Sequence, residues 1–255
     1  MNYDEKVNDY DRFAEKRHYN VTNGLMKSLR FVEKPMMLKM MPNIEGKRVL
    51  LLGCGTAEES ELLKKFNPKS ITGIDLSEKS IEVAKKAYPD LDFYVGDMHE
   101  LPFDNNSFDF VYSSLVINYA KDKEVVFKEI RRVLDDDGEF LFSACHPMRF
   151  ATQNCEVDGK RFHVIGFEAG SHGKVVLGNY MSHSKQINYF KDNQVLEEYI
   201  APPSYFFQSL IHTDFLVENF NESQCIQECK DVDLEYYTRF HEIPQFMAFL
   251  AKKNR

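Results

Sequence analysis

Short apolar runs alternate with segments of helical period through the middle of the chain. The run RVLLL at 48–52 is continuous and ends in Gly-Cys-Gly, which is typical of a strand buried on both faces. Four similar runs follow, SITGID, LDFYVGD, SFDFVYSS and EFLFSAC. Between them, residues 57–66, 77–88 and 121–134 place apolar side chains at helical spacing, and a turn is expected at Asp-Asp-Gly 136–138. This alternation predicts a parallel sheet covered by helices on both faces.

The pattern changes on both sides of this region. Residues 1–46 keep helical spacing, and their methionines at 36, 37, 40 and 41 predict a flexible apolar face. Residues 146–203 have no helical period and combine glycines with short β-like runs, which indicates an insertion with its own local structure. After Pro202-Pro203, Ser204 is expected to cap a helix, and DFLVENF and QFMAFLAKK are expected to form two final strands.

We therefore predict an α/β fold built on a doubly wound, mostly parallel, seven-stranded sheet. Its expected parts are an N-terminal helical lid at 1–46, a ligand-binding core at 47–145, a substrate-covering insertion at 146–203, and the rest of the core sheet at 204–255.

Charge and hydropathy limit the possible partners. The formal net charge is −8, and an acidic chain repels a phosphate backbone, so we expect no nucleic-acid partner. Since no apolar run approaches the roughly 20 residues of a membrane-spanning helix, we expect no membrane partner. The charged first residues, MNYDEKVNDYDRF, lack the apolar centre of a signal peptide, which favours a cytoplasmic protein.

The potential metal ligands are scattered. None of the five cysteines forms a C-x-x-C pair, and Cys225 and Cys229, four residues apart, have no second ligand pair nearby. His163, His172 and His183 are too widely spaced to indicate a metal triad. We expect free buried thiols and no bound metal.

Candidate ligand-binding residues follow the strands. Gly53 and Gly55 remove side chains where the backbone must pass close to a ligand. Asp75 ends the second strand, where a carboxylate can accept hydrogen bonds from both ribose hydroxyls of an adenosine. Asp97 and Met98 end the third strand, where an adenine ring is expected to lie. The alternative is a generic doubly wound domain with tight turns.

Residues 48–145 resemble the class I S-adenosylmethionine-dependent methyltransferases that act on small molecules. The resemblance is carried by the segments RVLLLGCGTAEES, ITGIDLSEKSIEVAKK, GDMHELPFDNNSFDFVYSSLVINY and FKEIRRVLDDDGEFLFSACHP. It implies S-adenosylmethionine as the cofactor, with Gly53, Cys54 and Gly55 under its methionine portion and sugar. The other implied contacts are a ribose-binding Asp75, an apolar Leu76 on adenine, Asp97 and Met98 at the adenine edge, and Ser113 and Ser114 beside the methionine portion.

The chain departs from that family at two positions of the first strand and turn. Leu51 stands where the family usually has Asp, and Ala57 where it usually has a third glycine. The missing carboxylate predicts weaker cofactor binding or a substitute from elsewhere in the chain. Glu58 separates this family from the nicotinamide dehydrogenases, because a carboxylate there would repel a pyrophosphate at the helix N-terminus, whereas a sulfonium cofactor carries no phosphate.

The resemblance implies transfer of a methyl group by direct in-line displacement. Alignment of the reactants alone can lower such a barrier by about 7–11 kcal/mol, and a base is needed only for a protonated acceptor. His146, directly after the fifth strand, and Tyr119, just past the fourth, are the candidates for a base or an acceptor contact. Alternatively, His146-Pro147 only caps the strand and turns the chain.

Two other segments are expected to close the site. Tyr10, Phe13 and Arg17 could form part of the N-terminal lid, or lie on an amphipathic surface helix. Aromatic residues of the insertion are expected to cover the crevice and select a small-molecule acceptor, and some of them to form a small core: Phe162, Phe167, Tyr180, Tyr189, Phe190 and Tyr199.

Two other functions stay open. Leu51 is compatible with a non-catalytic module that binds S-adenosylmethionine. A protein or nucleic-acid methyltransferase is disfavoured by the acidic charge and by the lack of an Asn-Pro-Pro-Tyr-type motif.

Overall fold

The computed structural model describes residues 11, 14–151, 153–157, 160–164, 167–168, 174–175, 180–181, 183–189 and 195–254. Its main sheet has seven strands in the order β12-β13-β5-β4-β1-β2-β3. Strands β1 to β5 run parallel to one another, and β13 is antiparallel to both β5 and β12. The predicted doubly wound, mostly parallel sheet is therefore confirmed. The strands are β1 Arg48–Leu52, β2 Ser70–Asp75, β3 Asp92–Val95, β4 Phe108–Ser113, β5 Leu134–Cys145, β12 Phe215–Glu222 and β13 Phe246–Lys253.

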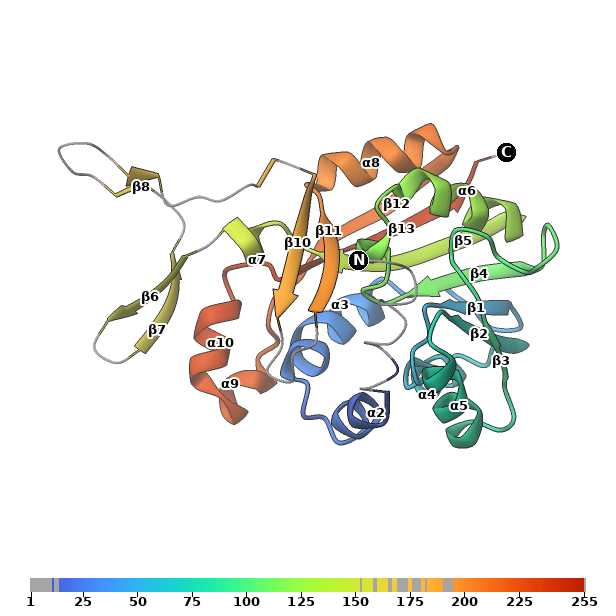
Figure 1. Cartoon of the computed structure of the whole chain (residues 1–255), viewed down its shortest axis with the longest axis horizontal. Coiled ribbons are helices and arrows are strands. Elements are labelled where there is room, and N and C mark those ends of the chain that lie inside the picture. Colours follow the sequence, from blue (N-terminus) through green and yellow to red (C-terminus); the bar gives the residue numbers. More distant parts are fainter. Residues whose placement is uncertain are drawn as a thin grey trace.

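Helices cover both faces of this sheet (Figure 1). On one face lie α3 Lys34–Lys39, α4 Glu59–Lys64 and α5 Glu78–Ala87, and on the other α6 Lys123–Val133 and α8 Pro203–His212. Each face has its own buried cluster. Leu51 belongs to the cluster that contains α3, α4 and α5 side chains, whereas Leu50 and Leu52 belong to the cluster with α6 and α8. Strand β1 is thus buried on both faces, as its continuous apolar run predicts.

The N-terminal segment is helical, as predicted. It comprises α2 Ala14–Thr22, the π-helical turn η1 Leu29–Glu33 and α3. Pro35 is the second residue of α3, which follows the π-helical turn directly. Met36, Met37 and Met40 are buried in the core, which confirms the expected methionine face.

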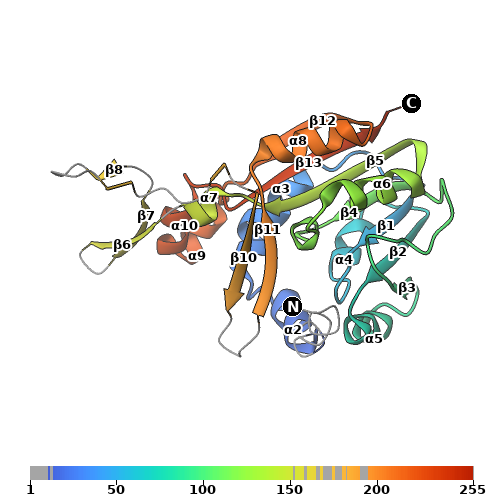
Figure 2. The same cartoon turned by 45° about the horizontal axis from the view of Figure 1, so that its top comes forward.

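The insertion is built mainly from hairpins. It opens with α7 Met148–Ala151, a helix that the sequence pattern does not predict, and continues with antiparallel pairs. The pair β10–β11 extends from the start of α8 toward α2, whereas the β6–β7 pair and β8 project away from the sheet (Figure 2). These pairs are β6 Gln153–Val157 with β7 Lys160–Val164, β8 Phe167–Glu168 with β9 Lys174–Val175, and β10 Ser184–Tyr189 with β11 Val195–Ile200.

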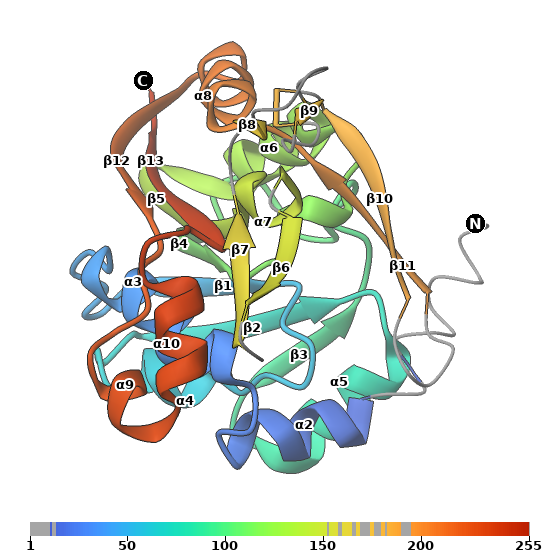
Figure 3. The same cartoon turned by 90° about the vertical axis from the view of Figure 1, so that its left-hand side faces the viewer.

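Two short helices connect β12 to β13 (Figure 3). They are α9 Glu228–Val232 and α10 Leu234–Phe240. Within the described part of the chain, the helices are too short and too polar for any of them to span a bilayer.

Two predicted boundaries are wrong. The Asp-Asp-Gly segment 136–138 lies inside β5, because the strand bulges there: Phe108 pairs with Leu134, but Phe110 already pairs with Glu139. Ser204 lies inside α8 and not at its cap. Pro202 is the N-cap, and Pro203 begins the helix because its fixed φ is already helical.

The turn after β1 depends on left-handed backbone. Gly53 and Gly55 have φ of 64° and 54°, and Ala57 has φ of 65°. A Cβ atom on Gly53 would lie 2.3 Å from Cγ2 of Val116, so the space beside this glycine is already filled. The Cys54 N–H donates to the Ile74 carbonyl at 2.9 Å, which holds the turn against the end of β2.

We expect Gly53→Ala to lower the free energy of unfolding by about 3 kcal/mol or more, through a left-handed alanine and a clash with Val116. Gly46→Ala is the matched control, because Gly46 has φ of 72° but nothing within 4 Å of its Cβ position. It should cost only about 1–2 kcal/mol. Urea unfolding measures both, and adding Val116→Ala should recover part of the Gly53→Ala loss. Equal losses at the two glycines would contradict the clash.

We expect Leu51→Asp to destabilise the fold increasingly as the pH rises. Leu51 is 1% exposed and pairs in register with Tyr112, and burial together with the nearby carboxyl groups of Glu33 and Glu59 raises the pKa of that tyrosine. A buried carboxyl in this surrounding has a raised pKa, so the folded state keeps a proton that the unfolded state has lost. The free energy of unfolding should therefore fall between about pH 5 and 8, by several kcal/mol relative to the wild type.

The control is Leu51→Ala, which leaves a cavity and should cost about 2–5 kcal/mol at either pH. If Leu51→Asp is as stable as the wild type at pH 8, strand β1 accepts the carboxylate that the methyltransferase family usually has at this position, and the prediction is wrong.

Candidate functional site

The candidate site lies at the carboxyl edge of the parallel strands. Strands β1, β2, β3 and β4 are neighbours in the sheet and run in the same direction, so their carboxyl ends meet at one edge. The structure thereby brings together the turn at 53–55 with Asp75, Asp97 and Ser114, which are separated along the sequence.

Asp75 ties the glycine turn to the end of β2. Its Oδ2 accepts the Gly55 N–H at 2.7 Å, and its Oδ1 accepts the Ser77 N–H at 3.0 Å. Burial raises the pKa of Asp75, while these backbone amides and the Arg17 guanidinium oppose that shift. Because each carboxylate oxygen can accept more than one hydrogen bond, the side chain keeps acceptor capacity for a pair of ribose hydroxyls.

Asp97 is oriented by a residue that the sequence analysis does not anticipate. Its Oδ1 accepts the backbone N–H of His99 at 2.9 Å and lies 2.6 Å from Nδ1 of the same histidine. No described residue donates to Oδ2, which is therefore available to an amino group such as that of adenine. Met98 is partly buried against the cluster that contains Leu101.

The two serines after β4 point to different partners. Ser113 is buried and its hydroxyl donates to the Leu52 carbonyl at 3.2 Å, which links β4 to β1. Ser114 donates at 2.9 Å to Oε1 of Glu33, the last residue of η1. The side chain of Ser113 thus serves the sheet, and that of Ser114 connects the strand end to the N-terminal helices.

Glu33 is the centre of a buried polar cluster. Its Oε1 also accepts the Ser143 hydroxyl at 2.6 Å, and Ser143 Oγ accepts the Leu115 N–H at 3.0 Å. Burial raises the pKa of Glu33 to about 7, with Glu59 adding to the shift and the two serine hydroxyls opposing it. The sequence analysis missed Glu33. The available signal was a lone acid within an apolar helical face, between Val32 and Met36.

The N-terminal helix α2 covers the glycine turn. Arg17 Nε lies 3.7 Å from the position that a Cβ on Gly55 would take. His18 Nδ1 lies 3.1 Å from Oε1 of the buried Glu58, and Asp11 accepts the Ser77 hydroxyl at 2.5 Å. Arg17 therefore lies beside the glycine turn, and its part in a lid stays a prediction. Tyr10 and Phe13 lie outside the described residues.

A buried lysine joins the insertion to the segment after β4. Lys123 Nζ donates to the carbonyls of Ala120 at 3.1 Å and Tyr199 at 2.9 Å, and burial lowers its pKa to about 7. This contact fixes β11 beside the short helix η2 Ile117–Tyr119, which carries the candidate Tyr119. Asn118 is fully buried, and neither its side-chain oxygen nor its nitrogen has a partner among the described residues. Sequence reasoning missed both Lys123 and Asn118.

His146 lies at the same edge of the sheet, after β5, and both of its ring nitrogens are in contact. Nδ1 accepts the Met148 N–H at 3.1 Å, and Nε2 lies 2.9 Å from Oε1 of Glu222. Burial lowers the pKa of His146, and the Glu222 carboxylate opposes that shift. The imidazole is 1% exposed, so an acceptor could reach it only after this arrangement opens.

Parts of the predicted covering segment are described. The His183 ring lies 4.5 Å from that of Tyr205, and the Tyr180 ring 6.2 Å from His146. The side chains of Phe162, Phe167, Tyr189, Phe190, His163 and His172 lie outside the described residues. Over the described part of the chain, no cluster of three or more histidine, cysteine or acidic side chains could hold a metal ion, and the four cysteines described there are free and buried.

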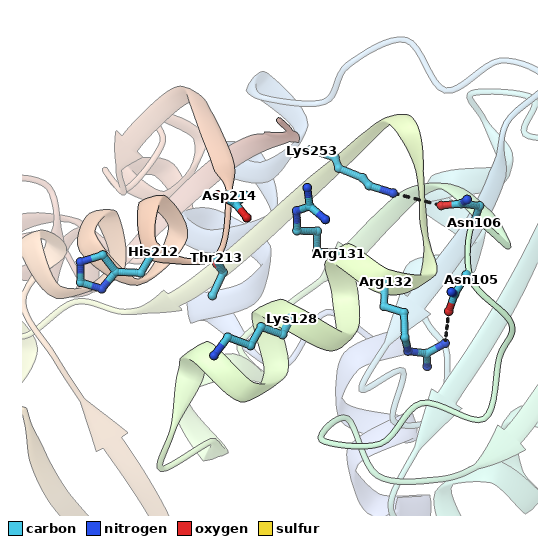
Figure 4. A pocket seen from close by; sticks show the side chains of 9 residues that line it. All are labelled: Asn105, Asn106, Lys128, Arg131, Arg132, His212, Thr213, Asp214 and Lys253. Atoms are coloured by element: carbon cyan, nitrogen blue, oxygen red, sulfur yellow. Dashed lines mark hydrogen bonds between the residues drawn. The ribbon is translucent and has the colours of Figure 1, made fainter. Parts of the chain in front are cut away.

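A pocket of about 460 Å³ lies at the opposite edge of the sheet, where β5 begins and β13 ends (Figure 4). Figure 4 shows two of its cations bound to asparagine side chains, Arg132 to Asn105 at 3.1 Å and Lys253 to Asn106 at 3.0 Å. Lys253 also donates to the Leu134 carbonyl at 2.8 Å. This pocket is separate from the candidate site.

Comparison with known proteins supports the resemblance to methyltransferases. A family model described as a methyltransferase domain matches residues 50–142. An uncharacterized protein of Haemophilus influenzae is 29% identical over 234 residues, 87% of each chain. Demethylmenaquinone methyltransferase of Thermotoga maritima is 34% identical over 52% of this chain and 58% of its own. Malonyl-[acyl-carrier protein] O-methyltransferase of Legionella pneumophila is 30% identical over 58% of this chain and 50% of its own. The chain thus spans 58% of the length of the first of these two named enzymes and 50% of the length of the second.

Solved structures share the fold at lower identity. An S-adenosylmethionine-dependent methyltransferase of Mesorhizobium loti superposes with a TM-score of 0.70 at 23% identity, over 86% of this chain and 97% of its own. A putative methyltransferase of the same kind from Listeria monocytogenes has a TM-score of 0.69 at 23% identity, over 88% and 97%.

The strand order, the residues at the strand ends and the matching domain agree with one another. They identify S-adenosylmethionine as the methyl donor. Residues 50–142 thus form a methyltransferase domain, and the chain has the fold of the S-adenosylmethionine-dependent methyltransferases.

Proposed function

We propose that the protein methylates a small molecule held between the carboxyl edge of the sheet and residues 146–203. The observation that carries this proposal is the contact between Lys123 and the Tyr199 carbonyl, because it fixes the hairpin β10–β11 beside the segment that follows β4. The acceptor is then enclosed by the insertion and faces the cofactor at the strand ends. Two named relatives support a small acceptor, since their names specify demethylmenaquinone and fatty acid as substrates. The name of a third relative specifies a malonyl group that is carried on acyl-carrier protein.

The described residues fit S-adenosylmethionine. The positive φ angles of Gly53 and Gly55 expose backbone on which the methionine portion and sugar can lie. Asp75 has acceptor capacity for the ribose, and the free Oδ2 of Asp97 suits the adenine amino group. We assign Leu76 to the apolar face of adenine and the Met98 N–H to its edge.

The charges beside the turn also suit this cofactor. Glu58 and Glu59 are buried at the start of α4, and Asp75 accepts the Gly55 N–H of the turn that precedes it. Carboxylates in this position would repel a phosphate, whereas they attract a sulfonium. S-adenosylmethionine supplies a methyl group on a positively charged sulfur, so the chain has only to bind, align and exclude water.

The roles of the acceptor-side residues follow from their contacts. Tyr119 lies on η2, next to the buried Asn118, and is our candidate for contacting the acceptor. Asn118 is proposed to complete its hydrogen bonds with the acceptor's polar group, because an unpaired buried amide is costly. His146 as a general base stays a prediction, and the contacts of its two nitrogens favour a role in positioning the insertion.

We expect Asp75→Asn to weaken S-adenosylmethionine binding about 10- to 30-fold, which is about 1–2 kcal/mol, because the ribose hydroxyls lose a charged acceptor. Isothermal titration calorimetry measures this. Asp109→Asn is the matched control. Asp109 pairs with Arg48 near the start of β4, at the edge of the sheet opposite the site, so this variant should leave the affinity unchanged. Unchanged affinity in Asp75→Asn would remove the ribose assignment.

We expect the insertion to determine the acceptor and the core to determine the cofactor. Replacing residues 153–189 with a short linker keeps β11 and its contact with Lys123, and should abolish methyl transfer while cofactor affinity stays within about threefold. The assay is formation of S-adenosylhomocysteine with an acceptor identified by screening quinones, phenols and carboxylic acids. Loss of cofactor binding in a folded variant, or full activity on that acceptor, would contradict this division.

A further inference from the structure

Glu33 is a fully buried carboxyl group with only half of its hydrogen-bonding capacity used. Its side chain is 0% exposed, Oε1 accepts both serine hydroxyls, and Oε2 has no partner among the described residues. Buried polar atoms without partners are rare in folded proteins and usually mark a water, an ion or a ligand. The unfilled position therefore needs an explanation.

Neither charge state of Glu33 is complete in the observed surroundings. When ionised, the group has two serine hydroxyls as donors and no cation of its own. When protonated, its O–H needs an acceptor that the described residues do not provide at Oε2. A cation that approaches Oε2 would complete the ionised state.

The charges that face Glu33 leave it without a counterion. Glu59 on α4 interacts unfavourably with it, and Lys34 on α3 favourably. Lys34 Nζ, however, lies 3.5 Å from Oε1 of Glu59 and pairs with that carboxylate. Tyr112 on β4, whose hydroxyl is also unpartnered, carries no charge near neutral pH because burial raises its pKa well above the usual range. When both carboxyl groups are ionised, Lys34 balances only one of them, so the cluster lacks one positive charge.

The position of Glu33 identifies the source of that charge. Ser114, which donates to Glu33, ends the strand segment assigned to the methionine portion of the cofactor. Two residues further on, Val116 contacts Gly53 of the turn beneath that portion. The methionine portion carries the ammonium and the sulfonium of S-adenosylmethionine.

We propose that Glu33 binds the cationic methionine end of S-adenosylmethionine and that its carboxyl group releases a proton to solvent when the cofactor binds. This inference rests on the proposed placement of the cofactor. The O–H bond of Glu33 breaks, the proton goes to the buffer, and the carboxylate takes the ammonium as its partner. Since Glu33 is mostly protonated below about pH 7 in the free protein, proton competition weakens binding there.

The test is calorimetric titration of the full chain with S-adenosylmethionine at pH 6 and pH 8, each in two buffers of different ionisation enthalpy. At pH 6 the amino group of the free cofactor is already an ammonium, so the difference in proton release between wild type and Glu33→Gln at that pH isolates Glu33. We expect this difference to be roughly 0.4 of a proton released at pH 6 and less than about 0.1 at pH 8. Glutamine imitates the protonated acid, so Glu33→Gln should bind about as well as the wild type at pH 6 and about tenfold more weakly at pH 8.

Two controls keep the result specific. Asp109→Asn removes a carboxylate that pairs with Arg48 at the opposite edge of the sheet, and it should keep the proton release of the wild type. 5′-Deoxy-5′-methylthioadenosine lacks the amino-acid end, and the wild-type protein should bind it without releasing a proton. This second titration needs no variant, so it remains decisive if Glu33→Gln fails to fold.

The outcomes separate the two proposals. Absence of S-adenosylmethionine binding by the wild type would contradict the cofactor site itself. Binding without proton release at pH 6, or with the same release in Glu33→Gln or with methylthioadenosine, would overturn the role of Glu33 and leave the rest of the site intact.

Discussion

The hydrogen bonds of the Asp75 carboxylate are the interaction on which the rest of the site depends. One oxygen holds the Gly55 N–H of the turn after β1, and the other holds the Ser77 N–H at the start of α5. A single side chain thereby fixes two neighbouring strand-to-helix connections relative to each other. The same group is proposed to bind ribose, so cofactor affinity and turn geometry are coupled through it. Because Arg17 also interacts with Asp75, the N-terminal helix is connected to the same point.

The alternating core of the fold could be predicted from sequence because β1, β4 and much of β5 are apolar on both faces and the helices between the strands have a clear period. Strand β1 shows this, with Leu51 on one face and Leu50 on the other. Details set by pairing between strands were not visible. The bulge at 135–138 arises from the register of β5 against β4, and local turn residues gave the opposite impression. Pro203 begins α8 since its own φ is helical, whereas the pattern favoured the serine after it.

The site followed the same division. Residues at strand ends, such as Asp75 and Asp97, were predictable because the topology of a parallel sheet collects them at one edge. Glu33, Asn118 and Lys123 were not, because a single polar residue in an apolar or mixed segment gives no periodic signal. Their importance appears only when burial and missing partners are known, and those depend on elements far away in the sequence.

The placement of β13 between β5 and β12 has a consequence for how the protein folds. Phe142 of β5 pairs with Phe249 of β13, about 100 residues later in the chain, and their rings stack at 5.1 Å. Until β13 docks, one edge of β5 presents unpaired backbone groups and a row of buried phenylalanines to solvent. Pairing over such a distance forms late, because the intervening chain must lose much of its freedom first. The nascent protein therefore has a period in which this half-sheet is prone to aggregate, and chaperones that bind apolar strands would act on it then.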